Sequence, residues 1–184
     1  MNTTDEELVQ NTILGIKGSF DELVHRYTTL IYNFAYRLTG DISYAEDITQ
    51  ETFIKVWKNI HKYNSGYTFK TWIFTIARNT ATDFLRKRKL ILFSNLDTPD
   101  DNTSFESNIE DKEALPEESL IKLEDAEYLN KVLEQLPKNY QSVLVLHYQN
   151  DLTFEEIGKI MDKPPNTVKS WHRRSLMKLR EILE

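Results

Sequence analysis

The stretch "TFEEIGKIMDKPPNTVKSWHRRSLMKLR", Thr153 to Arg180, contains two short helical patterns separated by a double proline. Its first four residues form a capping box, in which the Thr153 side chain caps the third amide along and the Glu156 side chain reaches back to the amide of Thr153. The two prolines end the first helix, because proline cannot donate the backbone hydrogen bond that a helix needs. Asn166 is a suitable N-cap for the second helix. Two short helices joined by a tight break predict a helix-turn-helix.

The second helix of this pair concentrates cations in an acidic chain. The sequence has 23 Lys and Arg against 29 Asp and Glu, yet the segment from Thr167 to Arg180 holds five basic residues and no acidic one. Cations near a helix C-terminus suit the helix dipole, but this does not explain those near the start and middle. Since the major groove of DNA admits one α-helix, we favour DNA binding over an ordinary solvated face. The candidate DNA contacts are Asn166, Thr167, Lys169, Ser170, Arg173 and Arg174.

The composition favours helices and gives no sign of a membrane or redox protein. Only 5 Gly and 5 Pro occur among 184 residues, which is few for a fold rich in turns. The absence of Cys excludes disulfides and thiolate metal sites. No apolar run approaches the roughly 20 residues that span a bilayer, and the N-terminus lacks the features of a signal peptide. We therefore expect no stable membrane insertion and a cytoplasmic location.

Charge divides the chain into three parts. Residues 1–90 and 128–184 each carry a net charge of +2, whereas residues 91–127 carry −10, from 12 acidic and 2 basic residues. The acidic part is polar throughout most of its length and buries too little apolar surface to offset its ordering entropy. The sequence therefore predicts an all-α protein of two small helical domains, 1–90 and 128–184, joined by a flexible acidic linker. We also expect this strip to compete with DNA for the basic helices.

Helical periodicity accounts for most of both domains. Apolar residues at three- and four-residue steps predict helices over about 20–38, 43–63, 69–89, 129–136 and 139–148. Gly40 ends the first of these helices, and Ser43 is a candidate N-cap for the next. The segment "YNSGYT", Tyr63 to Thr68, is predicted to be a loop by its Asn, Ser and Gly content.

Three segments carry a family resemblance. The stretch from Leu136 to Leu183, with its Leu-Pro, Glu-Ile-Gly and Thr-Val-Lys-Ser motifs, resembles the promoter-binding C-terminal domain of bacterial sigma factors. "AEDITQETFIKVW", from Ala45, resembles their polymerase-binding helix, and "FKTWIFTIARNTATDFLRKRK", from Phe69, resembles their downstream-promoter helix. The two-domain arrangement resembles the extracytoplasmic-function (ECF) subgroup. His172 stands where the family usually has Leu or Ile.

The resemblance implies a function, partners and a location. The protein would bind core RNA polymerase and direct promoter-specific transcription initiation, without being an enzyme and without a cofactor. It would recognise the minus-ten element largely as separated strand and the minus-thirty-five element as duplex, through the helix-turn-helix. It would work at the nucleoid in the cytoplasm, and an anti-sigma factor is a probable partner in this family.

The second predicted helix carries the residues implied for polymerase binding. Asp47 and Glu51 lie one turn apart and share a face, which by spacing alone is equally well a solvated polar surface. The resemblance implies that this face docks the polymerase clamp. Phe53 and Trp57 lie near it, and core packing is the favoured role for both. The candidate polymerase-binding residues are Asp47, Gln50, Glu51, Phe53 and Trp57.

The third predicted helix and the loop before it carry the residues implied for minus-ten recognition. Asn79 would read a base edge, while Arg78, Arg86 and Lys87 would hold phosphates. Tyr67 and Phe69 are candidates for stacking on an extruded base. A solvated stripe and a plain core role for Phe69 remain the alternatives.

Two other functions are compatible with parts of the sequence. A stand-alone transcriptional regulator would use the same helix-turn-helix but has no reason to carry "AEDITQETFIKVW". A helical hydrolase would use Asp47 and Glu51 as a carboxylate pair, but no residues spaced for a metal site accompany them.

Overall fold

The computed structural model describes residues 3–64, 66–94, 128–129 and 131–183. Within these ranges the chain forms helices and no strand, as the sequence predicts. The predicted linker falls almost wholly on residues 95–127, which lie outside the described residues, so its flexibility and its competition for the basic helices stay predictions. Residues 91–94 were assigned to that linker, but they continue the preceding helix. No helix in the described part of the chain combines the length and apolarity that crossing a membrane requires.

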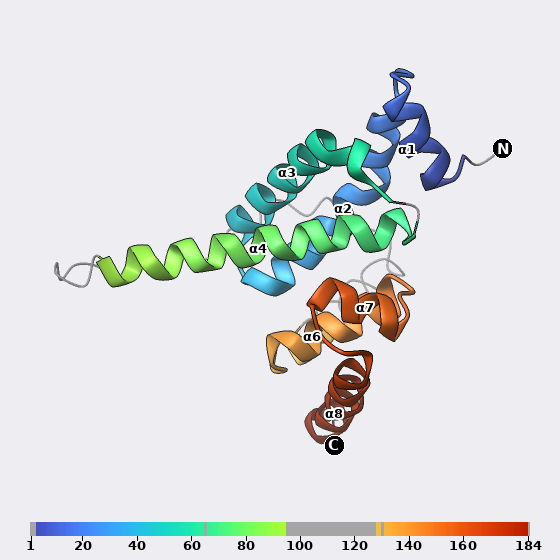
Figure 1. The fold of residues 1–184 in the computed structure, drawn as a ribbon. Coiled ribbons are helices and arrows are strands. Elements are labelled where there is room, and N and C mark those ends of the chain that lie inside the picture. The colour runs from blue at the N-terminus through green and yellow to red at the C-terminus, as the bar shows by residue number, and fades with distance from the viewer. Residues whose placement is uncertain (1–2, 65, 95–127, 130, 184) are drawn as a thin grey trace, which may run out of the picture.

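The N-terminal domain is built on α2 (Ser19–Thr39), α3 (Ile42–Asn59) and α4 (Phe69–Ser94). The long α4 crosses the molecule, and α2 and α3 lie along it (Figure 1). Gly40 ends α2 in a left-handed conformation, as predicted. The N-cap of α3 is Asp41 and not the predicted Ser43, because the Asp41 carboxylate accepts a hydrogen bond from the amide of Tyr44 at 3.0 Å. A short 3₁₀ turn, η1 (Ile60–Lys62), completes this region.

An N-terminal helix, α1 (Asp5–Ile13), was not predicted. It begins with a capping box between Thr4 and Glu7, whose Thr-x-x-Glu signal is present in the sequence. The helix is fixed to α2 by Asp5, which accepts hydrogen bonds from the Tyr27 hydroxyl and from Arg26, the latter at 2.9 Å. Burial of the Tyr27 ring, and then its hydrogen bond to Asp5, raise the pKa of that hydroxyl. The hydroxyl therefore keeps its proton and acts as a donor.

The C-terminal domain contains residues 131–134 in a helical turn, α6 (Lys138–Leu144), α7 (Phe154–Met161) and α8 (Pro165–Leu183). The predicted helix over 139–148 is α6 continued by a π-helical turn, η2 (Val145–Gln149). The capping box at the start of α7 is confirmed, with both of its hydrogen bonds present. Asn166 is not the N-cap of the last helix, because α8 already begins at Pro165. Proline is favoured in a first helical turn, where its missing amide hydrogen costs nothing.

Gly158 permits the tight turn between α7 and α8. The amide of Lys163 donates to the carbonyl of Gly158 at 2.8 Å, so the chain folds back closely onto α7. A Cβ atom at position 158 would lie 2.7 Å from the backbone carbonyl oxygen of Lys163. Since a backbone atom cannot move aside without changing the turn, only glycine fits here.

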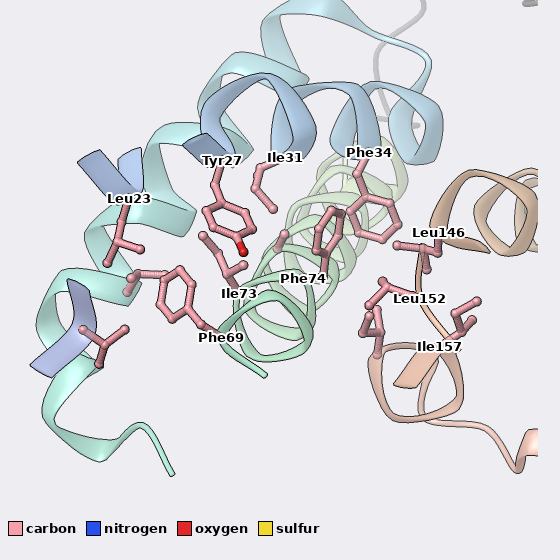
Figure 2. Close-up of a cluster of buried hydrophobic side chains, with 14 of the residues drawn as sticks. Leu23, Tyr27, Ile31, Phe34, Phe69, Ile73, Phe74, Leu146, Leu152 and Ile157 are labelled. Carbon is pink, nitrogen blue, oxygen red and sulfur yellow. The ribbon is translucent and has the colours of Figure 1, made fainter. Parts of the chain in front are cut away.

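The two domains share one hydrophobic core. Phe34 of α2 and Phe74 of α4 pack edge to face at 5.2 Å, and both are almost fully buried. Leu146, Leu152 and Ile157 of the C-terminal domain belong to the same buried cluster (Figure 2). The contact brings α7 against α4 and α6 against α2. This direct packing was not anticipated from the sequence, which indicated two modules connected through a linker.

The contact between α1 and α2 gives a first prediction. Replacing Tyr27 by Phe keeps the ring packed against Phe69 but removes the hydroxyl that donates to Asp5. We expect Tyr27→Phe to lower the free energy of unfolding by about 1.5–3 kcal/mol, the scale of a hydrogen bond to a charged group. Urea denaturation measures the change. Tyr36→Phe on the exposed side of α2 is the control and should change it by less than about 0.5 kcal/mol; equal losses in both variants would contradict the prediction.

Candidate nucleic-acid and polymerase interfaces

The packing of α8 determines which of its side chains face solvent. Val168 and Ser175 are buried, and Trp171 and Leu179 are half-buried, so one face of the helix lies against the C-terminal domain. This helix lies at the side of the domain remote from α4 (Figure 1). The predicted DNA contacts Asn166, Lys169, Ser170, Arg173 and Arg174 are all exposed, and Thr167 is half-buried.

Local interactions already engage some of these polar groups. The Ser170 hydroxyl donates to the carbonyl of Asn166 at 2.9 Å, and the amide of Thr167 donates to the carbonyl of Pro164 at 2.9 Å. Lys169 lies 3.9 Å from a carboxylate oxygen of Glu155 on α7, with both side chains half exposed or more. Such an exposed pair contributes little to stability. Lys169 is therefore easily redirected toward a phosphate.

His172 points inward, unlike its basic neighbours. Its ring lies 5.1 Å from Phe154 and 5.3 Å from His147, and its Nε2 is 3.0 Å from the hydroxyl of Tyr148. Partial burial, and then the nearby His147, lower the pKa of His172. The side chain thus fills the packing position that Leu or Ile usually occupies in the family, and the histidine does not displace the cationic face of the helix.

The exposed part of α4 presents the residues predicted for minus-ten recognition. Asn79, Arg86 and Lys87 are exposed, and Arg78 is half-buried. Arg78 donates to the Asn79 side-chain oxygen at 3.3 Å. Arg86 donates to Asp83 at 3.1 Å, so the carboxylate orients a cation of this stripe.

A groove beside Asn79 is lined by two lysines that were not singled out from the sequence. Its volume is about 460 Å³. Lys55 and Lys62 line it from α3 and η1, and Trp72 and Ile76 line it from α4. Lys55 donates to the hydroxyl of Thr80 at 3.1 Å, which holds the ammonium near the stripe of α4. Their placement depends on how α3 and α4 pack, so no local pattern marks them.

The two aromatic candidates for base stacking, Tyr67 and Phe69, lie in different environments. Phe69 is fully buried, with ring contacts to Tyr27 at 5.3 Å and Trp72 at 5.8 Å. It therefore packs in the core, the alternative that the sequence left open, and in this conformation it cannot stack on a base. Tyr67 is 52% exposed. The Lys159 ammonium lies 3.6 Å from the centroid of the Tyr67 ring.

One face of α3 carries the residues predicted for polymerase binding. Asp47 and Gln50 are exposed, Glu51 and Phe53 are half-buried, and Phe53 packs against the core. Trp57 is 57% exposed and contacts Phe20 at 4.8 Å, so its predicted core packing is wrong. By helical spacing Ile54 lies on the same face. It is 46% exposed and was not singled out from the sequence. Asp47, Gln50, Ile54 and Trp57 together form an exposed stripe, here called the α3 stripe.

Across the described residues, no three His, Cys, Asp or Glu side chains are grouped so that they can hold a metal ion. Asp47 lies exposed on a helix surface, and Glu51 contacts only Lys55, at 3.9 Å, among the ion pairs found there. The hydrolase alternative thus gains no support from the geometry.

Known proteins resemble the chain over nearly its whole length. The family model "Sigma-70 region 2" matches residues 23–91, and "Sigma-70, region 4" matches residues 126–179. The ECF RNA polymerase sigma factor SigW of Bacillus subtilis is 33% identical over 92% of this chain and 91% of its own length. RNA polymerase sigma-H factor of Pseudomonas aeruginosa is 31% identical over 90% and 86%.

Solved structures share the fold. RpoE of Bartonella quintana, solved with the anti-sigma factor NepR, has a TM-score of 0.68 at 22% identity, over 89% of this chain and 96% of that one. CnrH, solved with the cytosolic domain of CnrY, has a TM-score of 0.67 at 20% identity, over 97% and 96%.

The chain therefore belongs to the sigma-70 family of RNA polymerase sigma factors. Its full-length relatives place it in the ECF group of that family. It is a transcription initiation factor with a region 2 and a region 4, so a stand-alone regulator with an unrelated N-terminal domain is not favoured.

The inward position of His172 gives a prediction on pH dependence. Because the pKa of His172 is lower in the folded chain than its ordinary value of 6.5, the unfolded chain takes up the proton first as the pH falls. Folding therefore loses stability below about pH 6.5, where linkage favours the state that binds more protons. His172→Leu removes this titrating group, so the variant should gain stability relative to the wild-type chain as the pH is lowered from 7.5 to 5.5. Urea unfolding at a series of pH values measures this gain; parallel pH curves for the two chains would contradict it.

Proposed function

We propose that this sigma factor binds core RNA polymerase through the α3 stripe and reads a promoter through α8 and α4. The observation that carries the proposal is the orientation of α8. Its apolar face is buried against the domain, while Lys169, Arg173 and Arg174 face solvent. A helix held in this way can enter the major groove with its cations and Ser170 leading.

The role of α8 is to read the minus-thirty-five element as duplex. Arg173 and Arg174 are the candidates for base contacts, because arginine binds the paired acceptors of guanine in two hydrogen bonds. Asn166 and Thr167, at the start of the helix, suit phosphate contacts. Lys169 changes its partner from Glu155 to DNA.

The role of α4 is to hold the minus-ten element with its strands separated. Asn79 presents an amide to a base edge, and Arg78, Arg86 and Lys87 present cations to phosphates. Tyr67 is the stacking residue, since Phe69 is committed to the core. Duplex opening costs about 1.4 kcal/mol per base-pair step, and stacking a base on an aromatic ring returns about 1–3 kcal/mol. One captured base therefore offsets about one step of melting.

The proposed partners follow from the family and the exposed faces. The α3 stripe combines the polar Asp47 and Gln50 at its N-terminal end with the apolar Ile54 and Trp57 at its C-terminal end, a composition suited to a protein interface. An anti-sigma factor is a further partner, by analogy with RpoE and CnrH, whose structures contain NepR and the cytosolic domain of CnrY. Binding to promoter DNA and polymerase implies action at the nucleoid in the cytoplasm.

Transcription in vitro tests the DNA-reading role of α8. With purified core polymerase and a library of promoter fragments, the wild-type chain should select a subset of templates. Arg173→Ala should reduce initiation on those templates tenfold or more, since one good arginine contact to a base contributes about 1–3 kcal/mol. Lys178→Ala, at the far end of the helix, is the control and should retain most activity. Unchanged template selection with Arg173→Ala, or no difference with and without the chain, would refute the role.

A charge reversal tests the α3 stripe. Asp47→Arg should weaken binding to core polymerase by about tenfold or more, because a like-charge juxtaposition at an interface costs several kcal/mol. Glu181→Arg is the control, as Glu181 is exposed on α8, away from the α3 stripe. Fluorescence anisotropy of labelled chain against core polymerase measures both affinities. If the two reversals weaken binding equally, the effect is one of net charge and the stripe is not the interface.

A further inference from the structure

Two polar contacts join the domains at the loop that precedes α4. One carboxylate oxygen of Glu156, on α7, accepts hydrogen bonds from the hydroxyls of Thr71 at 3.1 Å and Thr68 at 3.3 Å. The two hydroxyls lie 2.9 Å from one another. These residues are 85 and 88 positions from Glu156 in the chain, so only the packing of the two domains brings them together.

The second contact covers the stacking candidate. Lys159 lies three residues after Glu156, on the same side of α7, and its ammonium lies 3.6 Å from the centroid of the Tyr67 ring. A cation at this distance over an aromatic face is attracted by the ring's electrons. It also occupies the face on which a nucleobase would stack.

Glu156 is ionised at the place where it meets the threonines. Partial burial by itself would raise its pKa, but hydrogen bonds from Thr153, and then from Thr71 and Thr68, outweigh burial and lower the pKa. The Glu156 carboxylate is thus a built-in anion held by two hydroxyl donors. A phosphate of a DNA strand presents oxygens of the same charge and the same hydrogen-bonding character to serine and threonine hydroxyls.

We propose that Glu156 and Lys159 together imitate one nucleotide of the separated minus-ten strand. Glu156 takes the place of a strand phosphate on Thr68 and Thr71, and Lys159 takes the place of a base on Tyr67. The inference rests on the proposed function in naming that strand as the displaced ligand. It assigns Thr68 and Thr71 as a phosphate site, and it makes the first helix of the helix-turn-helix an internal competitor for it.

If Glu156 and Lys159 compete with the strand, the affinity of the chain for single-stranded DNA depends on whether α7 covers the loop before α4. While α7 covers the loop, Tyr67, Thr68 and Thr71 are not available to the strand, so the apparent affinity falls with the fraction of open molecules. Weakening the contact should raise the affinity of the free chain for single-stranded DNA. Removing a threonine donor should weaken binding most where the competitor is already absent.

The test uses the full chain and fluorescein-labelled single-stranded oligothymidine of fifteen nucleotides, followed by anisotropy at low salt. Glu156→Gln removes the charge but keeps the capping box, because glutamine also serves at that position. We expect it to bind at least about threefold more tightly than the wild-type chain, the scale of one net hydrogen bond. Lys159→Ala should bind more tightly than Lys163→Ala, which loses an exposed lysine in the turn that follows the same helix.

Two further variants distinguish competition by Glu156 from a general loosening of α7. Thr153→Ala removes a capping-box hydroxyl that also donates to Glu156 at 2.8 Å, but it keeps the Glu156 charge and the contacts of Glu156 with Thr68 and Thr71, so it should raise the affinity less than Glu156→Gln does. Thr71→Val should weaken binding severalfold in the Glu156→Gln background and less in the wild-type background, because in the latter it removes both the site and its competitor. Circular dichroism confirms that each variant is folded.

The outcomes also distinguish this inference from the function on which it rests. The proposed competition is refuted if Glu156→Gln binds single-stranded DNA no more tightly than the wild-type chain, or if Thr153→Ala binds as tightly as Glu156→Gln. Either result counts whether or not the chain directs initiation with core polymerase. If Glu156→Gln and Thr71→Val behave as expected while the wild-type chain directs no initiation, the strand site stands and the promoter function fails.

Discussion

The hydrophobic core shared by the two domains is the constraint on which the remaining arrangement depends. Phe34 and Phe74 on one side and Leu146 and Ile157 on the other are almost completely shielded from water. Full burial of each such side chain contributes about 1.5–3 kcal/mol. This contact positions α7 over the loop before α4 and leaves α8 on the outer side of the molecule. The polar contacts of Glu156 and Lys159 lie at its edge and follow from it.

Local features of the fold were predictable, and contacts between distant segments were not. Periodicity identified α2, α3 and α4 because a helix places residues three and four apart on one face, whatever that face later meets. It could not show that Leu146 meets Phe34, since an apolar side chain does not specify its partner. For the same reason core packing was favoured for Trp57, which is exposed, and base stacking was considered for Phe69, which is buried. The helix α1 was missed for another reason. The signal for its Thr4 capping box is present in the sequence but was not used.

The solvent-facing cations of α8 were predictable because their placement is local. Glycine at position 158 and the prolines fix the turn, and Val168 and Ser175 then fix which face is buried. Arg173 and Arg174 face solvent as a consequence of helical geometry. The inward His172 fits the same register, since a half-buried ring beside His147 and Phe154 fills an apolar position. The lysines of the α3–α4 groove, by contrast, come together only through tertiary packing.

The closed arrangement affects the two kinds of partner differently. The α3 stripe and the cations of α8 are exposed while the domains are packed together, so the docking of polymerase that we propose for α3 would need no prior opening. Tyr67, Thr68 and Thr71 are engaged by α7 in this state, so the separated strand cannot reach them. A ligand shifts such an equilibrium only by its differential affinity for the two states. The free energy that separates α7 from α4 must therefore come from contacts made in the open state. Under the competition proposed for Glu156 and Lys159, the shared core sets that amount and makes strand binding at Tyr67, Thr68 and Thr71 conditional on a partner that holds the two domains apart.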